Sequence, residues 1–353
     1  MPASHEATAA DSQFIDALPV AHLPVVRAVI DQLGIREVLD DLLPANPRNR
    51  VSDADCVVLM LLNILEGRVA LYNMEKWLAR TDAELLFGRN CSSNAFNDTR
   101  LAVCLDRIAE HGTDNILAKI VTGFLSRENQ SSTRIIHNDT TSIKLLGAHD
   151  DPNAQPQPAR GHSKDRRPDL KQLIFGLALD GAVGVPLTCS MLAGNTSDHT
   201  ANRLHLDKLA RVLPADDEAT IVADCKLVDP VTLGKLLIEG FHFVSLLPAT
   251  YKLRHDLIEQ VRVEQTELPE LHRSAGRTKA SPPRVYRGRS VVRDFKVTWP
   301  QTSDDKPADH ELVPLRFLVV ESSQRAEPEF RRLGHTQTDP RASTSLGSGS
   351  VDS

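Results

Sequence analysis

The spacing of apolar residues predicts helices over the first third of the chain, from residue 18 to residue 128. One apolar helical face precedes a glycine stop and is formed by Val26, Val29, Ile30 and Leu33, before Gly34. Two polar patterns, Ser52-x-x-Asp55 and Thr81-x-x-Glu84, each stand directly before an apolar run and predict capped helix starts. The segment is therefore expected to be an all-α N-terminal domain of several short helices.

At Arg134 the apolar period changes to that of strands. Two short apolar runs end on aspartates, Asp139 and Asp224, and a hairpin signal at Asp180-Gly181 lies between them. The expected elements are strand 134–139, strand 173–179, strand 185–191, helix 198–213, strand 220–224, helix 230–239 and strand 241–247. A mixed sheet with helices on its faces accounts for this order, so residues 134–250 are expected to form an α/β domain.

The chain after residue 250 shows weaker signals. Residues 284–298 alternate between apolar and polar, and 315–320 form a further apolar run, so 251–326 is expected to be a β-rich region. Segment 327–353 is poor in large apolar residues and ends in Ser, Gly, Thr and Asp. Such a composition cannot build a core, so this tail is expected to be disordered. Residues 1–17 are expected to be a flexible N-terminus.

Composition and charge narrow the functional classes. The 353 residues are 41% hydrophobic and 25% charged, which is ordinary for a soluble globular protein of two domains and an appendage. The five cysteines contain no Cys-x-x-Cys pair, which argues against a zinc ribbon or a disulfide framework. We expect a cytoplasmic protein, because no signal peptide or membrane span is evident. The net charge of −6 means that any DNA contact must come from local basic clusters.

The two strand-end aspartates are the strongest candidates for catalysis. If their strands lie side by side in one sheet, Asp139 and Asp224 would form a carboxylate pair that suits a divalent metal. Two-metal phosphoryl transfer needs such carboxylates on rigid elements, with the ions about 3.5–4 Å apart. Magnesium accepts oxygen ligands and keeps some waters, so two or three carboxylates suffice. The competing interpretation is that each aspartate only caps the turn or helix after its strand.

The densest basic cluster lies in the polar stretch after the first aspartate. Two acids and five basic residues occur there within twelve positions. The basic residues are Arg160, Lys164, Arg166, Arg167 and Lys171. Arg and Lys neutralise phosphates, so we expect a DNA-binding arm near the carboxylates. The alternative is an ordinary solvated loop.

Four motifs carry a resemblance to a known family. They are His-Asn-Asp-Thr-Thr-Ser at 137–142, Gly-His-Ser-Lys-Asp-x-Arg-Pro-Asp-Leu-Lys-Gln at 161–172, Gly-Asn-Thr-Ser-Asp at 194–198 and Val-Ala-Asp at 222–224. In this order they resemble the DDE transposases of bacterial insertion sequences, in the insertion-sequence-four-like group. The resemblance covers about 134–247, and more loosely the helical region before it.

The resemblance implies a fold, a chemistry and partners. The catalytic domain would be an RNase H-like mixed sheet, preceded by the all-α domain and followed by a partial β-rich insertion. Asp139 and Asp224 would be the first two metal ligands of an Asp-Asp-Glu triad that uses Mg²⁺ or Mn²⁺ in a two-metal site for cut-and-paste transposition. The expected partners are DNA, as element ends and target, and a homodimer mate or other transposase copies. Such a protein would be nucleoid-associated and would have no membrane contact.

The third carboxylate of the triad is not evident. The family places it in a Tyr-x2-Arg-x3-Glu-x6-Lys pattern on a helix after the β-rich insertion. Here Tyr286-x2-Arg289 is followed by Arg293 at the position of the Glu. We therefore expect a truncated or frame-shifted transposase that is inactive on its own.

Other interpretations remain open. The chain could be a non-catalytic DNA- or transposase-binding fragment that acts as an inhibitor, or a different RNase H-like nuclease with its last carboxylate elsewhere. A zinc site built from scattered loop histidines, His137, His149 and His162, is disfavoured by their irregular spacing. A hydrolase built on Ser197 and His199 lacks a Gly-x-Ser-x-Gly elbow.

Overall fold

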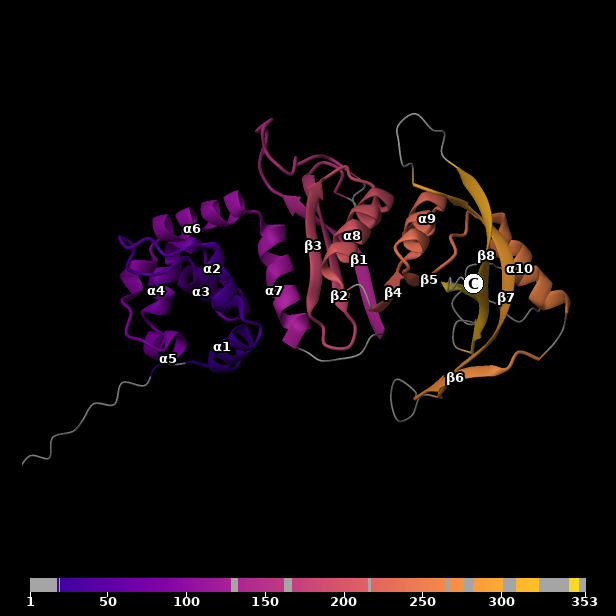
Figure 1. Ribbon diagram of the computed structural model, residues 1–353, viewed down its shortest axis with the longest axis horizontal. Helices are drawn as coiled ribbons and strands as arrows, with labels where there is room; N and C mark the ends of the chain where they lie inside the picture. Colours follow the sequence, from indigo (N-terminus) through magenta and orange to yellow (C-terminus); the bar gives the residue numbers. More distant parts are fainter. Residues whose placement is uncertain are drawn as a thin grey trace, which may run out of the picture. The chain divides into compact units, whose positions relative to one another are not determined.

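The structure, a computed structural model, has two units, Met1–Arg127 and Glu128–Ser353 (Figure 1). It describes residues 18, 20–127, 133–161, 167–214, 217–264, 267–275, 282–300 and 309–323, together with the backbone of 343–348. None of the helices in these segments is long and apolar enough to cross a bilayer.

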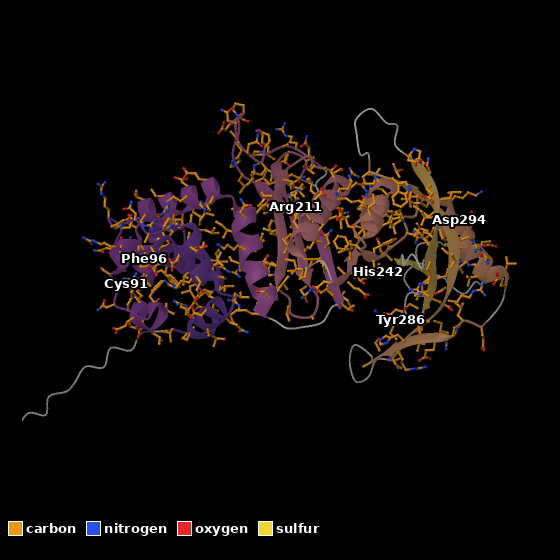
Figure 2. The ribbon with its side chains drawn as sticks, in the orientation of Figure 1. Cys91, Phe96, Arg211, His242, Tyr286 and Asp294 are labelled. Atoms are coloured by element: carbon orange, nitrogen blue, oxygen red, sulfur yellow. The ribbon has the colours of Figure 1, made fainter. Side chains whose placement is uncertain are left out.

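The first unit is all α, as the apolar spacing predicts. Its elements are α1 (Leu23–Gln32), α2 (Ile35–Leu42), α3 (Asp53–Leu65), η1 (Leu71–Asn73), α4 (Met74–Leu78), α5 (Ala83–Phe87), η2 (Ser93–Phe96), α6 (Asp98–His111) and α7 (Thr113–Arg127). Helix α3 contributes more buried residues to the main apolar core than any other helix of this unit, among them Leu59 and Leu62, and Phe96 (labelled in Figure 2) belongs to the same core. The apolar run that follows the first capping pattern is therefore the main core element of this unit.

The two predicted caps have different outcomes. Ser52 and Asp55 form a reciprocal capping box at the start of α3, as predicted. At α5 the prediction was wrong by one residue, because Asp82 is the N-cap and its Oδ1 accepts from Leu85 N at 2.9 Å. The Thr81 hydroxyl is engaged elsewhere, since it donates to a carbonyl oxygen of the preceding helix.

The second unit is built on one mixed sheet. Its strands are β1 (Thr133–Leu145), β2 (Lys171–Asp180), β3 (Pro186–Ala193), β4 (Glu218–Ala223), β5 (His242–Ser245), β6 (Glu270–Ser274), β7 (Arg284–Thr298), β8 (His310–Ser322) and β9 (Ser343–Ser348). The order across the sheet is β3-β2-β1-β4-β5-β9-β8-β7-β6, and β1 pairs with β4, and β4 with β5, in parallel. The other elements are α8 (Asp198–Val212), η3 (Cys225–Leu227), α9 (Pro230–Ile238) and α10 (Lys252–Val263).

Strand β1 has two different faces. Ile136, Asn138 and Thr140 are buried on one face, while His137 and Asp139 are exposed on the other. This alternation follows from the two-residue period of a strand. Helix α8 covers the buried face, where its side chains bond Asn138 and Thr140. Asp139 therefore points away from α8.

The C-terminal part differs from the sequence-based expectation in three ways. The strands of 251–326 are not a separate appendage, because they continue the same sheet as β1 to β5. Helix α10 was not predicted, although it buries Leu257 and Val261 at helical spacing. Within 327–353, where disorder was expected, β9 pairs with β5 and β8. Backbone pairing between two strand edges can order a segment that has little apolar surface of its own.

Candidate active site

The two candidate aspartates lie at the same level of neighbouring parallel strands. In the β1–β4 register His137 is opposite Val222, and Asp139 and Asp224 each follow two residues later. Both aspartates are exposed, and the backbone of Asp224 is still extended. Neighbouring strands lie about 4.8 Å apart. The predicted side-by-side strands are therefore confirmed, and convergence of the two carboxylates remains a prediction.

Each aspartate also has a local structural role. Asp139 Oδ1 accepts from Thr140 N at 2.7 Å. Asp224 is the N-cap of η3, and its Oδ1 accepts from Lys226 N at 2.9 Å. The Asp224 bond is the capping interaction of the competing interpretation. The prediction that a strand ends at Asp139 was wrong, because β1 continues to Leu145, so the Asp139 bond lies within the strand and caps no turn or helix. Each bond uses one oxygen of its carboxylate, so both bonds are compatible with metal binding.

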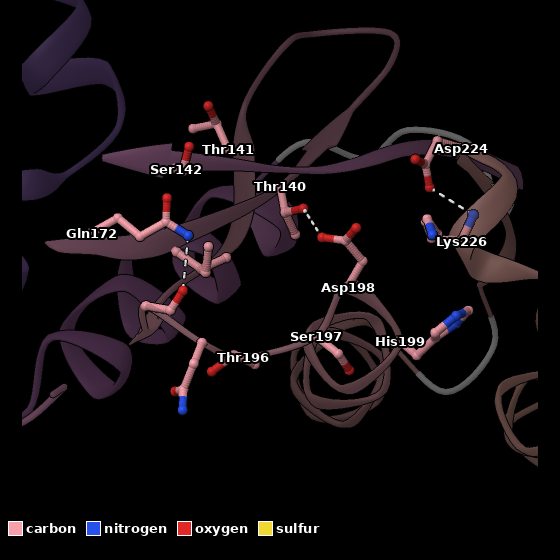
Figure 3. Close-up of a pocket in the computed structure, with 13 residues that line it drawn as sticks. Thr140, Thr141, Ser142, Gln172, Thr196, Ser197, Asp198, His199, Asp224 and Lys226 are labelled. Carbon is pink, nitrogen blue, oxygen red and sulfur yellow. Dashed lines mark hydrogen bonds between the residues drawn. The ribbon is translucent and has the colours of Figure 1, made fainter. Parts of the chain in front are cut away.

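A polar pocket of about 520 Å³ opens beside Asp224 (Figure 3). All four resemblance motifs, with their neighbours, line it: Thr140, Thr141, Ser142, Gln172, Ile174, Gly194, Asn195, Thr196, Ser197, Asp198, His199, Asp224 and Lys226. Asp139 is not among these lining residues, although Thr141, on the same face of β1, is. The structure thus brings the motifs together with Asp224 on the pocket wall, while Asp139 lies outside the pocket lining.

Two glycines hold the base of the basic arm against the loop before α8. A Cβ at Gly194 would collide with the carbonyl oxygen of Gln172, and a Cβ at Gly161 would collide with the carbonyl oxygen of Gly194. The buried Gln172 side chain joins them, since its Nε2 donates to Gly194 O at 2.8 Å. Glycine at both positions allows the second and third motifs to lie in direct backbone contact.

The basic arm is partly neutralised by its own acids. Arg167 forms a bidentate pair with Asp169, at 2.9 and 2.7 Å, and this hydrogen bonding lowers the pKa of Asp169 to about 2. Lys171 likewise bonds Asp150 and lowers the pKa of that carboxyl group. Arg160 is exposed, with its Nε 3.4 Å from the carbonyl oxygen of Asp169. Two further predicted arm residues, Lys164 and Arg166, lie outside the described residues.

Sequence reasoning did not assign Asp198 to the site. Its carboxylate lines the pocket and accepts from Thr140 Oγ1 at 3.1 Å (Figure 3). The Gly-Asn-Thr-Ser-Asp motif was the available signal, but helix capping already explained it. Ser197 is indeed the N-cap of α8 and accepts from Thr200 N at 3.2 Å.

The alternative hydrolase interpretation has no support in the geometry. Ser197 Oγ bonds Thr200 Oγ1 at 2.9 Å, whereas His199 Nδ1 lies 3.3 Å from Asp229 Oδ2. A serine nucleophile needs its histidine base within hydrogen-bonding reach, with the acid behind that base. Here the serine and the histidine have different partners.

The donor set fits one hydrated magnesium ion better than a two-ion centre. Asp139 and Asp224 supply exposed carboxylate oxygens at one level of the sheet, which suits an ion that keeps several waters. In the described segments no group of three or more His, Cys, Asp or Glu side chains could hold a metal ion. Of the histidines considered for zinc, His149 bonds a nearby carbonyl oxygen and His162 lies outside the described residues.

Comparison with known proteins gives a match for the helical unit. Residues 15–122 match the family DUF4277, described as a domain of unknown function. No curated protein matches the chain. The chain also resembles the solved structure of a piggyBac transposase synaptic complex with hairpin DNA. That comparison has a TM-score of 0.35 and 10% sequence identity, and it covers 99% of this chain and 55% of that chain. The comparison with a Mos1 transposase paired-end complex with left transposon end has a TM-score of 0.23 and 15% sequence identity, and it covers 59% of this chain and 62% of that chain.

These two likenesses are too weak to establish a shared fold. The chain spans about half of the piggyBac transposase chain that it matches. What the comparisons identify is a DUF4277 segment in the first unit.

Proposed function

We propose that this chain is a DDE-type, insertion-sequence transposase-like protein that acts on DNA ends. One observation carries the proposal: four motifs from distant parts of the sequence line a single pocket, next to two aspartates on neighbouring parallel strands, Asp139 in the middle of β1 and Asp224 directly after β4. The strand order β3-β2-β1-β4-β5, with a hairpin followed by parallel crossovers, supports the RNase H-like domain that the motifs imply.

In this proposal Asp139 and Asp224 hold the divalent ion, Mg²⁺ or Mn²⁺. A bound ion of this kind activates an attacking oxygen and stabilises the leaving oxygen of a phosphodiester. The chain's own contribution is to fix two carboxylates on rigid strands and to hold DNA in place. Arg160, Lys164, Arg166, Arg167 and Lys171 would bind backbone phosphates at the entrance of the site.

The proposed activity is incomplete, because a two-ion site needs a further carboxylate. Glu311 and Glu321 of β8 are candidate substitutes for this carboxylate. Glu311 accepts from Trp299 Nε1 at 2.9 Å, and Glu321 lies opposite Arg287 in the β7–β8 register. Neither forms a metal-binding group with other acids of the described segments. We infer that the chain holds one ion and does not complete strand transfer alone.

A second candidate function is a non-catalytic fragment that binds DNA or other transposase copies and acts as an inhibitor. The missing third carboxylate favours it, since DNA binding requires only the basic arm. Metal binding at the aspartates discriminates the two functions, because a pure binding fragment has no need of it.

Iron-mediated backbone cleavage tests the proposal. Fe²⁺ bound at the site, with ascorbate and peroxide, should cut the chain near residues 139 and 224, and excess Mg²⁺ should suppress the cuts. The cuts should disappear in Asp139→Ala and Asp224→Ala. They should persist in the control Asp256→Ala, which removes an exposed carboxylate from α10. Cleavage elsewhere, or none, would contradict the proposed metal site.

A further inference from the structure

Helix α8 presents a stripe of three polar side chains to β1. Asp198, Asn202 and His205 stand at i, i+4 and i+7, so they share one face of the helix. Their partners on β1 are Asn138 and Thr140, the two residues that flank Asp139. The helix therefore bonds the strand directly before and directly after the candidate metal ligand, from the opposite face of the sheet.

The bonds of this stripe form two sets, one at Thr140 and one around Asn138. Thr140 Oγ1 donates to Asp198 Oδ1 at 3.1 Å, and Asn138 Nδ2 donates to Asn202 Oδ1 at 2.9 Å. His205 Nδ1 lies 2.7 Å from Asn138 Oδ1 and must be the donor, because an amide oxygen only accepts. The side chain of Asn138 is thus held at both its nitrogen and its oxygen.

Both sets of bonds lie in the interior, where apolar residues would be the usual choice. His205 is 0% exposed, Asn202 4%, Asn138 5% and Thr140 9%. Buried polar groups add little net stability, but their fixed donors and acceptors permit only one arrangement of the packed elements. A shift of β1 by one residue would move Asp139 to the face covered by α8. The stripe excludes that shift.

Strand β2 has a glycine where the His205 ring packs against it. Gly176 of β2 lies directly under the His205 ring, and a Cβ there would collide with the ring atoms Cε1 and Nε2. Gly176 is opposite Thr140 in the β1–β2 register. A glycine in a central strand weakens it, so this one is explained by the close approach of the ring.

We propose that Asp198, Asn202 and His205 are positioning residues that hold Asp139 at the level of Asp224 for divalent-cation binding. The inference rests on the proposed function and adds residues that do not touch the ion themselves. They act through Asn138 and Thr140, so the carboxylate is fixed by its two chain neighbours.

Manganese binding to the full chain, followed by electron paramagnetic resonance, tests this role. Asn202→Leu keeps the side-chain size and removes the acceptor for Asn138. It should weaken Mn²⁺ binding about tenfold or more, and it should also lower the melting temperature, because the buried Asn138 amide loses its acceptor. Asn202→Asp keeps the acceptor and should bind Mn²⁺ as the unmodified chain does. Leu209→Ala, in the buried apolar part of the same helix, should lower the melting temperature and leave Mn²⁺ affinity unchanged.

Amide hydrogen exchange distinguishes failure of the positioning role from failure of the proposed metal-binding function. Without metal, amide hydrogen exchange over 136–145 should speed up in Asn202→Leu relative to the rest of the second unit, and not in Leu209→Ala. Equal Mn²⁺ affinity or equal exchange in Asn202→Leu and the unmodified chain would overturn the positioning role. If the unmodified chain itself shows no Asp139-dependent Mn²⁺ binding, the proposed function fails, and the exchange result still decides whether the stripe fixes β1.

Discussion

Gly234 of α9 lies directly against the backbone of Thr298 at the end of β7. A Cβ at position 234 would collide with the Thr298 carbonyl oxygen, and Val297 lies on the same side. This contact joins the part of the sheet that carries the aspartates to the β7–β8 hairpin. Apolar side chains from both parts line one small cavity, with Leu233 and Phe243 from the first part and Phe295 from β7.

Gly234→Ala should therefore destabilise the second unit. In a helix, alanine is normally more favourable than glycine by about 1 kcal/mol. Here the added Cβ would force the backbones of α9 and β7 apart, and such overpacking costs about 1–3 kcal/mol of stability. The matched control is Gly123→Ala in α7, where nothing lies within 4 Å of the added Cβ. That change should be neutral or stabilising in urea unfolding. Equal effects at the two positions would show that the contact is loose.

Removal of the Asp55 carboxylate should destabilise the first unit strongly. Asp55 is 2% exposed and pairs with Arg36 at 2.7 Å and Arg89 at 2.5 Å. Asp55→Ala would leave both guanidinium groups without this partner and would remove one half of the capping box of α3. Arg89 is 47% exposed, so the cost should fall below the range of about 3–5 kcal/mol for a fully buried pair. Urea unfolding followed by Trp77 fluorescence, in a Trp299→Phe background, measures the loss. Asp98→Ala, at an exposed position of α6, is the control and should cost much less.

The Asp55 carboxylate should also make the stability of the first unit depend on pH. Burial opposes ionisation of Asp55, but hydrogen bonds from Arg36, Arg89 and the Ser52 backbone outweigh it, so its pKa is lowered. A group with a lowered folded-state pKa stabilises the fold above its unfolded pKa of about 3.9, and this stabilisation is lost as the pH falls through the folded value. The first unit should therefore lose stability below about pH 4. Asp55→Asn should flatten that loss.

Asp169→Asn should strengthen DNA binding by the arm. The substitution removes the ionic partner of the bidentate Arg167 pair and one negative charge from the arm. An additional phosphate contact should steepen the dependence of log K on log salt by about one unit. Because the pKa of Asp169 is about 2, the pair should stay ionic from pH 7 to pH 4 and not release Arg167 on mild acidification. Asp256→Asn on α10 is the control.

Alanine at all five arm positions should have the opposite effect. Replacement of Arg160, Lys164, Arg166, Arg167 and Lys171 should remove most DNA affinity and flatten the salt slope, by about one unit for each phosphate that the arm no longer binds. Unchanged affinity and slope in a filter-binding titration would identify the arm as an ordinary solvated loop.

The chain should not join DNA ends. With Mg²⁺ or Mn²⁺ and DNA carrying the element's own ends, we expect binding without joined products, because positioned ions at both reacting oxygens supply most of the rate. Joined products that vanish in Asp139→Ala would contradict this expectation. Glu311→Gln and Glu321→Gln would then be the first variants to examine for the missing carboxylate.

Local signals predicted the elements well and the site only in part. The alternation over 284–298 matches β7 at both ends, and the helix expected at 230–239 matches α9 to within one residue. These features depend on a few neighbouring residues, which the sequence displays. The cap of α5 moved from Thr81 to Asp82 because a carbonyl of another helix engages the threonine. Asp198 was missed because its capping motif gave a sufficient local explanation, while its bond to β1 depends on the tertiary fold.

The back-to-back glycines at 161 and 194 have a mechanical consequence. The base of the arm and the loop before α8 are in backbone contact there, with no side chain between them. A side chain at position 161 or 194 would therefore push that loop away from the arm and from Gln172. Asp198 follows the loop directly, so the same displacement would break its bond with Thr140 of β1.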